Sequence, residues 1–321
     1  VSASNNSYWP EMYENMSIVN KAPNLPYSYD LHKPSRFGMS TSQDPNLIMS
    51  PIDLANCIFY KKNINKYSPI TMSNWFFEYA KKSEKHLKEA INKYKKKEEP
   101  KFKRLVIDLQ ILICLGKFFS YKIQSSCYWE LFIKTKIYNL GLTSIKFYQK
   151  SFSEWATVSD ISKNYYLPDL TYGPQTWLRG RWDDRLPAIK EDIELMKKKF
   201  YNTKFAQINN QNYTKLLEKK LTQKFLIKHK TTITKKGLSI SIHDFKISKN
   251  IELYLNYREI NQSKNWMRKK IKTKENSIFA NISNKLLLSK YPIQYYFELV
   301  NNNNYSSFCP GFVKNLSNQP Y

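Results

Sequence analysis

The sequence predicts an α+β multidomain protein in which an N-terminal α-helical bundle is followed by an immunoglobulin-like β-sandwich. Apolar residues recur at helical spacing over residues 51–204, whereas short β-rich runs fill residues 205–321. Residues 1–50 are irregular and rich in Pro, Ser and Asn, with aromatic residues spread through them. We therefore expect three parts: an extended aromatic-rich arm at 1–50, the bundle at 51–204 and the sandwich at 205–321.

The helices of the bundle are predicted from apolar residues that recur on one face. They are expected at 51–60, from Thr71 or Ser73 to Lys97, at 102–135, at 142–160 and at 188–200. The segment 102–135 is the most apolar, so it should form the core of the bundle. Residues 163–187 contain several prolines, which predicts a long structured connection between the last two helices.

The strands of the sandwich follow a short helix that is predicted at 213–221. They are expected at 225–233, 238–242, 251–257, 266–271, 277–282 and 293–300. Short strands at this density, over about 100 residues, are typical of an immunoglobulin-like sandwich.

The charge of the chain is strongly positive, with 52 Lys and Arg against 26 Asp and Glu and a net charge of +26. Such a charge is typical of proteins that bind nucleic acid or another polyanion. Only seven of the basic residues are Arg, however, and Lys, Asn, Ile and Tyr are abundant while Gly is scarce. A/T-rich coding produces that composition too, so a solvated surface and a polyanion site are both open. The densest basic clusters are Lys93 to Lys97 and Arg268 to Lys274.

Several kinds of site are excluded or disfavoured by the residues present. Cys57, Cys114, Cys127 and Cys309 form no CxxC and no zinc-ligand spacing, so buried thiols are predicted, with a disulfide left open. The four His are isolated, and no Gly-rich phosphate loop, GxSxG or HExxH occurs. We therefore expect no cofactor and no metal. Apolar runs fall short of the roughly 18 residues that a membrane span needs.

The densest polar cluster consists of Arg179, Arg181, Trp182, Asp183, Asp184 and Arg185. Arg forks beside an aromatic ring suit a carboxylate, a phosphate or a sugar, and the two carboxylates suit acid–base work on a glycosidic bond. Alternating Arg and Asp also tie loops to their neighbours through salt bridges. Both interpretations are kept as hypotheses for these residues.

A second candidate lies in the N-terminal arm, where Tyr8, Trp9 and Glu11 stand close together. Sugars stack on exposed aromatic rings, and a carboxylate binds their hydroxyls, so these residues could line a sugar subsite. The alternative is an arm that buries its aromatic side chains against a neighbouring domain.

Several tracts together resemble a known group of proteins. They are Tyr8-Trp-Pro-Glu-Met-Tyr, Pro34-Ser-Arg-Phe-Gly, Tyr166-Leu-Pro-Asp-Leu-Thr-Tyr-Gly-Pro, Leu178-Arg-Gly-Arg-Trp-Asp-Asp-Arg-Leu-Pro-Ala-Ile, Leu255-Asn-Tyr-Arg-Glu-Ile-Asn-Gln and Tyr291-Pro-Ile-Gln-Tyr-Tyr-Phe-Glu-Leu. In this order the chain resembles the C-terminal part of large bacterial glycoside-hydrolase-like proteins, in which a helical region and a β-sandwich follow a barrel. The resemblance implies an upstream catalytic domain that would end within the arm at 1–50 and would hold the main carboxylates. It also implies a secreted or periplasmic location, and it assigns no catalytic residue here.

The leading hypothesis is therefore a non-catalytic C-terminal accessory portion of a carbohydrate-active protein, with glycan and an upstream catalytic domain as partners. Both ends of the sequence, Val1 and Tyr321, look cut, which fits a processed chain or a fragment. The rival hypothesis is a basic protein that binds nucleic acid or another polyanion. A third is a self-sufficient glycoside hydrolase that uses Glu11 or the Asp183/Asp184 pair.

Overall fold

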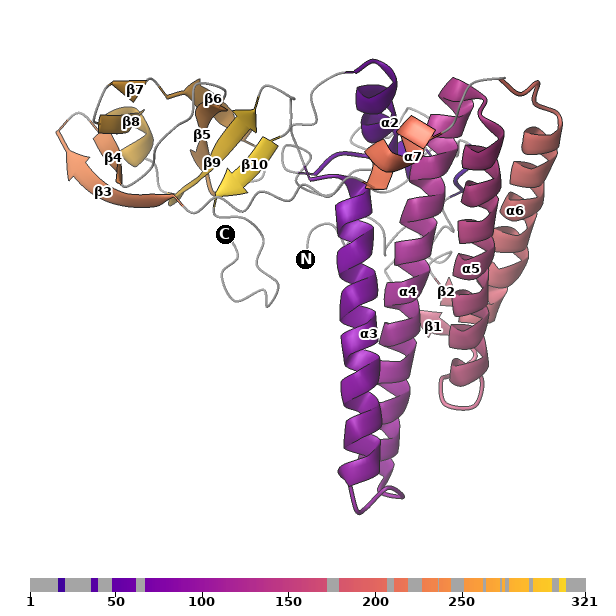
Figure 1. The fold of residues 1–321 in the computed structure, drawn as a ribbon. Helices are drawn as coiled ribbons and strands as arrows, with labels where there is room; N and C mark the ends of the chain where they lie inside the picture. Colours follow the sequence, from indigo (N-terminus) through magenta and orange to yellow (C-terminus); the bar gives the residue numbers. More distant parts are fainter. Residues whose placement is uncertain are drawn as a thin grey trace. The chain divides into compact units, whose positions relative to one another are not determined.

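The structure is a computed structural model, and it describes residues 17–20, 36–39, 48–61, 67–171, 179–206, 211–218, 227–235, 237–243, 251–261, 264–271, 273–274, 277–288, 291–301 and 306–309. The described residues divide into two compact units (Figure 1). The first, called the helical unit, carries all of them up to Glu218. The second, called the sheet unit, runs from Ile227 to Cys309.

The helical unit is built on four long helices that pack on one another in chain order. They are α3 (Pro69–Lys93), α4 (Pro100–Thr135), α5 (Tyr138–Ser162) and α6 (Leu186–Tyr201). Short connections join α3 to α4 and α4 to α5, so neighbouring helices run antiparallel, as in an up-down bundle (Figure 1). The smaller elements are η1 (Phe37–Met39), α2 (Pro51–Phe59), a two-stranded ribbon of β1 (Leu170–Thr171) and β2 (Arg179–Gly180), η2 (Trp182–Arg185) and α7 (Gln211–Glu218).

Local sequence signals set where these helices begin and end. Ser50 caps α2, because its hydroxyl accepts from the Asp53 backbone N–H at 3.2 Å and the Asp53 carboxylate accepts from Ser50 in return. Ser68 caps α3 by accepting from the Thr71 N–H at 3.1 Å. A proline follows each cap at the first helical position, where its missing N–H costs nothing. At its end α4 turns into the left-handed residue Lys136, whose N–H donates to the Phe132 carbonyl at 2.8 Å.

Serines let the central helices approach closely. The Ser125 and Ser144 hydroxyls each donate to the other's carbonyl, at 2.9 and 2.8 Å, and so join α4 to α5. Ser73 donates to the Ser120 carbonyl at 2.9 Å and joins α3 to α4 in the same way. Large side chains fill the remaining space, and the fully buried ones include Phe118, Trp129, Phe132, Tyr148 and Trp155. The predicted role of the apolar segment 102–135 as the core helix is confirmed.

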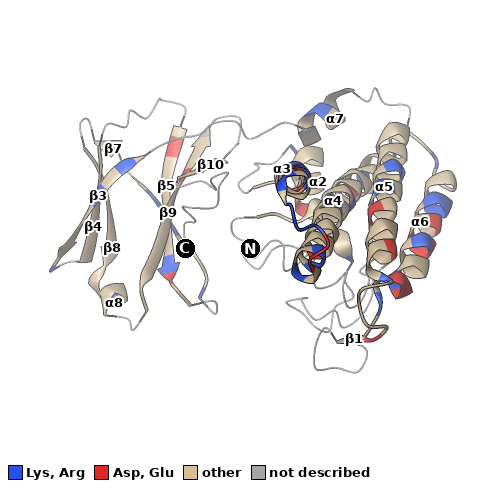
Figure 2. Ribbon diagram, turned by 90° about the horizontal axis from the view of Figure 1, so that it is seen from below, with Lys and Arg blue, Asp and Glu red and all other residues tan. Residues whose placement is uncertain are grey.

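The sheet unit contains two four-stranded antiparallel sheets. One has the order β3-β4-β8-β7 and the other the order β10-β9-β5-β6. The strands are β3 (Lys228–Thr234), β4 (Gly237–His243), β5 (Ile251–Glu259), β6 (Met267–Lys270), β7 (Thr273–Lys274), β8 (Ser277–Ser283), β9 (Ile293–Asn301) and β10 (Ser306–Cys309), with a short helix α8 (Asn284–Leu287) after β8. The sheets form two layers (Figure 2).

Both sheets contribute to one apolar core. Ile240 and Ile282 come from the first sheet, and Leu255, Phe297 and Leu299 come from the second. The core residues of each strand are two apart, as the pleat requires, which explains the alternating sequence pattern. The described chain therefore consists of a helical region followed by a region of antiparallel sheets, as the sequence predicts.

The structure also departs from the sequence prediction in several places. The strands β1, β2, β7 and β10 were not expected, because each has only two to four residues and no alternation to detect. The helix α7 was expected after the boundary at 205, but it contacts α2 and belongs to the helical unit. All four cysteines are thiols, and Cys114, Cys127 and Cys309 are buried, as expected.

Replacing Gly141 by alanine is expected to destabilise the helical unit by about 1–3 kcal/mol. A Cβ at this position, in the first turn of α5, would lie 2.6 Å from the Phe200 ring and 3.0 Å from the Phe132 ring. Urea unfolding followed by tryptophan fluorescence measures the change. The control is Lys146→Ala on the exposed face of the same helix, which should stay within about 0.5 kcal/mol. An unfolding midpoint that is unchanged in Gly141→Ala would contradict this packing.

Candidate functional site

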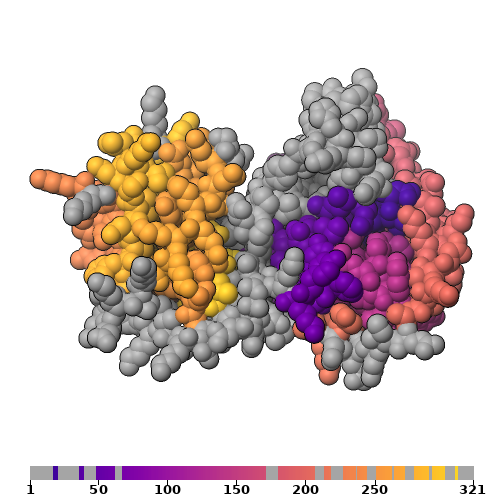
Figure 3. All heavy atoms as spheres, turned by 90° about the horizontal axis from the view of Figure 1, so that it is seen from above, coloured from indigo at the N-terminus to yellow at the C-terminus, as the bar shows by residue number. Residues whose placement is uncertain are grey.

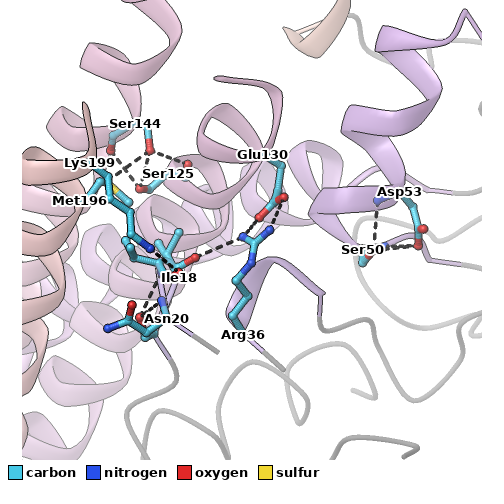
Figure 4. A network of polar contacts seen from close by, with 12 residues as sticks. Ile18, Asn20, Arg36, Ser50, Asp53, Ser125, Glu130, Ser144, Met196 and Lys199 are labelled. Carbon is cyan, nitrogen blue, oxygen red and sulfur yellow. Dashed lines mark hydrogen bonds and ion pairs between the residues drawn. The ribbon is translucent and has the colours of Figure 1, made fainter. Parts of the chain in front are cut away.

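A buried ion pair joins Arg36, the residue before η1, to Glu130 in the last two turns of α4. The Arg36 guanidinium donates to both carboxylate oxygens of Glu130, with Nη2 and Oε2 2.8 Å apart. The Arg36 side chain is 11% exposed and that of Glu130 is 2% exposed. Arg36 also donates to the Ile18 carbonyl at 3.2 Å, so the pair reaches a third segment of the chain (Figure 4). Burial lowers the pKa of the guanidinium, while the fork geometry favours its charged form.

A second buried carboxylate, Asp192 on α6, binds the same N-terminal segment. It accepts from the Ile18 backbone N–H at 2.8 Å, from the Ser17 hydroxyl, and from the Tyr148 hydroxyl of α5 at 2.8 Å. Asp192 is 3% exposed, and these three donors compensate for its desolvation. Together Arg36, Glu130, Tyr148 and Asp192 form what we call the N-terminal clasp, because they hold residues 17–20 against the bundle.

A buried lysine lies close to the clasp. Lys122 is fully buried on α4, and its ammonium lies 5.0 Å from the centre of the Phe37 ring and 5.4 Å from that of Tyr148. Cations are attracted to aromatic faces at such distances, more strongly when water is excluded. Lys122, Ser126 and Glu130 follow one another at intervals of four residues, so they share one face of α4. In Figure 3 the indigo atoms of the earliest described segments lie against magenta atoms of the central helices.

Sequence reasoning missed the clasp, although three of its four side chains are buried charges. A signal was present: Lys122 and Glu130 are charged residues inside the most apolar predicted helix, at a spacing of two turns. Each of the four clasp side chains already has a protein partner, and this arrangement suits holding chain segments together. It offers no exposed group to a substrate.

The predicted Arg/Asp cluster lies in the loop that leads into α6. The Arg181 guanidinium pairs with Asp183 at 3.1 Å, and the Asp184 carboxylate accepts from the Arg181 backbone N–H at 2.6 Å. Arg185 lies at the end of the short helix η2, and Arg179 lies in β2, opposite Thr171. These contacts use both carboxylates to order the loop ahead of the α6 N-terminus.

Trp182 is the anchor of this loop. It is 7% exposed, its ring meets that of Tyr166 edge-on at 5.0 Å, and its carbonyl accepts from the Trp155 indole N–H at 2.7 Å. A sugar stacks on an exposed ring face, so the burial of Trp182 favours the structural interpretation of the cluster. The other candidates, Tyr8, Trp9 and Glu11, lie outside the described residues.

A half-buried charge cluster lies between α3, α4 and α5. Lys117 pairs with Glu84 at 3.0 Å, and this hydrogen bond lowers the pKa of Glu84. Burial raises the pKa of Glu154, and it raises the pKa of the Cys114 thiol to about 11. Carboxylates with opposite pKa shifts are a feature of acid–base sites. Here Lys117 contacts the lower-pKa member directly, so the arrangement also serves as an interhelical salt bridge.

The basic cluster at Arg268 to Lys274 is largely neutralised where its side chains are described. Arg268 pairs with Glu298 at 2.8 Å, and its guanidinium lies 3.5 Å from the centre of the Tyr254 ring. Lys270 pairs with Glu252. The neighbouring Arg258 lies over the Trp266 ring at 4.4 Å. This face of β5, β6 and β9 is therefore a network of paired charges and rings.

In the part of the chain that the structure describes, no three His, Cys, Asp or Glu side chains gather as metal ligands. Over the same residues, no helix combines the length and apolar character that crossing a bilayer requires.

Comparison with known proteins gives one weak structural likeness. A solved structure described as a GH138 enzyme targeting pectin rhamnogalacturonan II is similar over 78% of this chain, with 12% sequence identity and a TM-score of 0.43. The chain covers 34% of that protein, or about a third of its length. At this TM-score the likeness assigns no function. No family model matches the chain, and the search of curated proteins gives no match.

Replacing Glu130 by glutamine is expected to destabilise the helical unit by about 3–5 kcal/mol, because the Arg36 charge stays buried without its partner. The double variant Arg36→Met, Glu130→Met should recover most of this loss, since it removes both charges. Asp160→Asn, which breaks the exposed pair with Lys163, is the control and should cost less than about 1 kcal/mol. Chemical denaturation measures all three, and equal effects of Glu130→Gln and Asp160→Asn would contradict a buried pair.

Cys114 is expected to react with iodoacetamide at pH 8 about a hundredfold more slowly in the folded protein than in urea. The thiolate is the nucleophile, and raising the thiol pKa from 9.0 to about 11 lowers its population by that factor. Mass spectrometry of alkylated peptides over time gives the two rates. Equal rates in the folded and unfolded protein would contradict the desolvation of this thiol.

Proposed function

We propose that this chain is the non-catalytic C-terminal accessory portion of a carbohydrate-active, glycoside-hydrolase-like protein. In this proposal the helical unit buttresses an upstream catalytic domain. The sheet unit acts as a spacer that contacts glycan. The main catalytic carboxylates would lie upstream, and the protein would act in a secreted or periplasmic location.

The N-terminal clasp is the observation that carries the proposal. Two carboxylates, Glu130 near the end of α4 and Asp192 in α6, are buried in the bundle, and both bind segments that precede the first long helix. Burying charges is costly unless they are fully hydrogen-bonded, so the interaction fixes those segments in one geometry. A bundle that holds the chain where it enters is suited to support whatever domain that chain comes from.

The sheet unit supports the proposal through its strand order. If the seven strands β3, β4, β5, β7, β8, β9 and β10 are lettered A to G in chain order, one sheet reads A-B-E-D and the other reads G-F-C, with β6 added at the C edge. That order is the one found in immunoglobulin domains. We propose an immunoglobulin-like sandwich, with domain limits near 51–204 and 205–321 shifted by α7, which packs with the bundle.

The carbohydrate part of the proposal rests on the sequence resemblance. Its two longest motifs, which begin at Tyr166 and Leu178, meet in space: Leu170–Thr171 pairs with Arg179–Gly180, and the Tyr166 ring packs on Trp182. The motifs therefore describe one structural corner of the helical unit, between α5 and α6. The fold by itself assigns no activity.

The test compares this chain with the native protein encoded by the complete reading frame. We expect hydrolysis of polysaccharide by the native protein and none by this chain alone. Glu130→Gln in the native protein should shorten the thermal half-life of that activity while leaving KM unchanged, because the clasp supports the catalytic domain without touching substrate.

Two outcomes would contradict the proposal. Hydrolysis by this chain alone, lost in Asp183→Asn or Asp184→Asn, would make it an enzyme in its own right. A native protein that neither hydrolyses nor binds any polysaccharide would remove the carbohydrate role.

A further inference from the structure

The hairpin of α3 and α4 ends in a rigid turn, which we call the hairpin tip and define as residues 93–104. The Tyr94 and Phe102 rings stack at 4.2 Å, and the Tyr94 hydroxyl donates to Glu99 at 2.7 Å. The Glu99 backbone N–H donates to the Lys96 carbonyl at 3.0 Å, and Lys103 pairs with Glu98. In the helical unit α3 and α4 run on past the end of α5, so the tip projects from the bundle (Figure 1).

The hairpin tip carries exposed cations that no anion neutralises. Six basic side chains are exposed there, and they make no ion pair with any residue that the structure describes: Lys93, Lys95, Lys96, Lys97, Lys101 and Arg104. Of the two acidic residues of the tip, Glu98 pairs with Lys103 and Glu99 accepts from the Tyr94 hydroxyl, so seven basic side chains stand against two carboxylates and the tip stays strongly positive. Figure 2, seen from the side of the tip, shows blue at the end of α3 and in the turn.

The other dense basic cluster of the chain behaves in the opposite way. Arg268 and Lys270 each have a glutamate partner, so their charge is offset locally. A bias toward lysine at neutral surface positions would add charge without regard to such pairing. The two clusters therefore differ in what they offer to a partner: the tip presents a net positive field on a fixed scaffold, and β6 does not.

The chemistry of the tip favours a particular kind of polyanion. Five of its six free cations are Lys, compact point charges that attract an anion without the fixed paired geometry of a guanidinium fork. Its exposed ring, Tyr94, is stacked on Phe102, so it does not form a platform for nucleic-acid bases. The tip also lacks the apolar face that would insert into a lipid surface. A flexible polymer with single, spaced carboxylates fits these features.

We propose that the hairpin tip is a docking site for linear acidic polysaccharide, that is, a chain of uronic acid residues. The inference rests on the proposed carbohydrate function and names the substrate class for it. The lysines bind the carboxylates by charge, and the projection of the tip lets a long polymer lie across it.

The experiment measures binding of fluorescently labelled polygalacturonate to the whole chain by anisotropy between 25 and 200 mM salt. The tip variant carries Lys→Gln at 93, 95, 96, 97 and 101. The matched control carries Lys→Gln at 146, 190, 198, 204 and 230, which are exposed and dispersed, so both variants lose the same charge. We expect the tip variant to bind about thirtyfold more weakly at 50 mM salt, with a shallower salt slope, and the control to change less than about threefold.

Labelled duplex DNA, neutral dextran and vesicles with anionic lipid serve as competing probes on the same proteins. Tighter binding of DNA or of the vesicles, lost in the tip variant, would overturn the proposal and make the tip a site for that partner. Equal losses in the tip variant and the control would overturn it as well, since only net charge would then matter. If the chain binds dextran but not polygalacturonate, the tip proposal fails while the carbohydrate role stands. If it binds neither polysaccharide, both fail.

Discussion

The ion pair between Arg36 and Glu130 is the interaction on which the helical unit depends. It places two opposite charges in a core that is made mostly of aromatic rings, aliphatic side chains and serines, and that also buries Lys122 and Asp192. Removing a buried charge from water is costly, so each partner is tolerated only when the other is in place. Because the two residues are far apart in sequence, the pair forms only when residues 36–39 dock on α4. Asp192, on α6, is a further buried charge of this kind. Arg36 binds the carbonyl of Ile18 and Asp192 binds its backbone N–H. The geometry of the bundle and that of the segment before it are thereby coupled.

In the proposed function, this coupling is the property that suits the bundle to a supporting role. Hydrophobic packing is non-directional and tolerates small shifts, whereas a forked ion pair with a further bond to a backbone carbonyl fixes position and angle. The serine contacts between α4 and α5 add to that rigidity, because two reciprocal hydrogen bonds set the distance between the helices. A domain attached through residues 17–20 would be held against a bundle with little freedom to move.

The net positive charge of the chain does not by itself indicate a polyanion partner. Its total of +26 is compatible with a polyanion binder and with a coding bias. The structure distinguishes the two basic clusters: Arg268 and Lys270 pair with glutamates, whereas five of the six lysines of the hairpin tip make no ion pair with a residue that the structure describes. What a partner experiences is the field of the uncompensated groups, and this field depends on which side chains the fold brings together.

The sequence by itself determined the order of helices and strands, because periodicity is a local property of the backbone. The apolar repeat of 102–135 and the alternation in 251–257 specified α4 and β5 within a few residues. It also identified the Arg/Asp cluster as a feature of the chain. Only the tertiary structure shows how that cluster is packed, since the burial of Trp182 against Tyr166 and Trp155 is a contact between separate segments. The clasp, too, is visible only in the tertiary structure. Glu130 is a charge on an apolar helix, and its partner Arg36 lies 94 residues away in sequence.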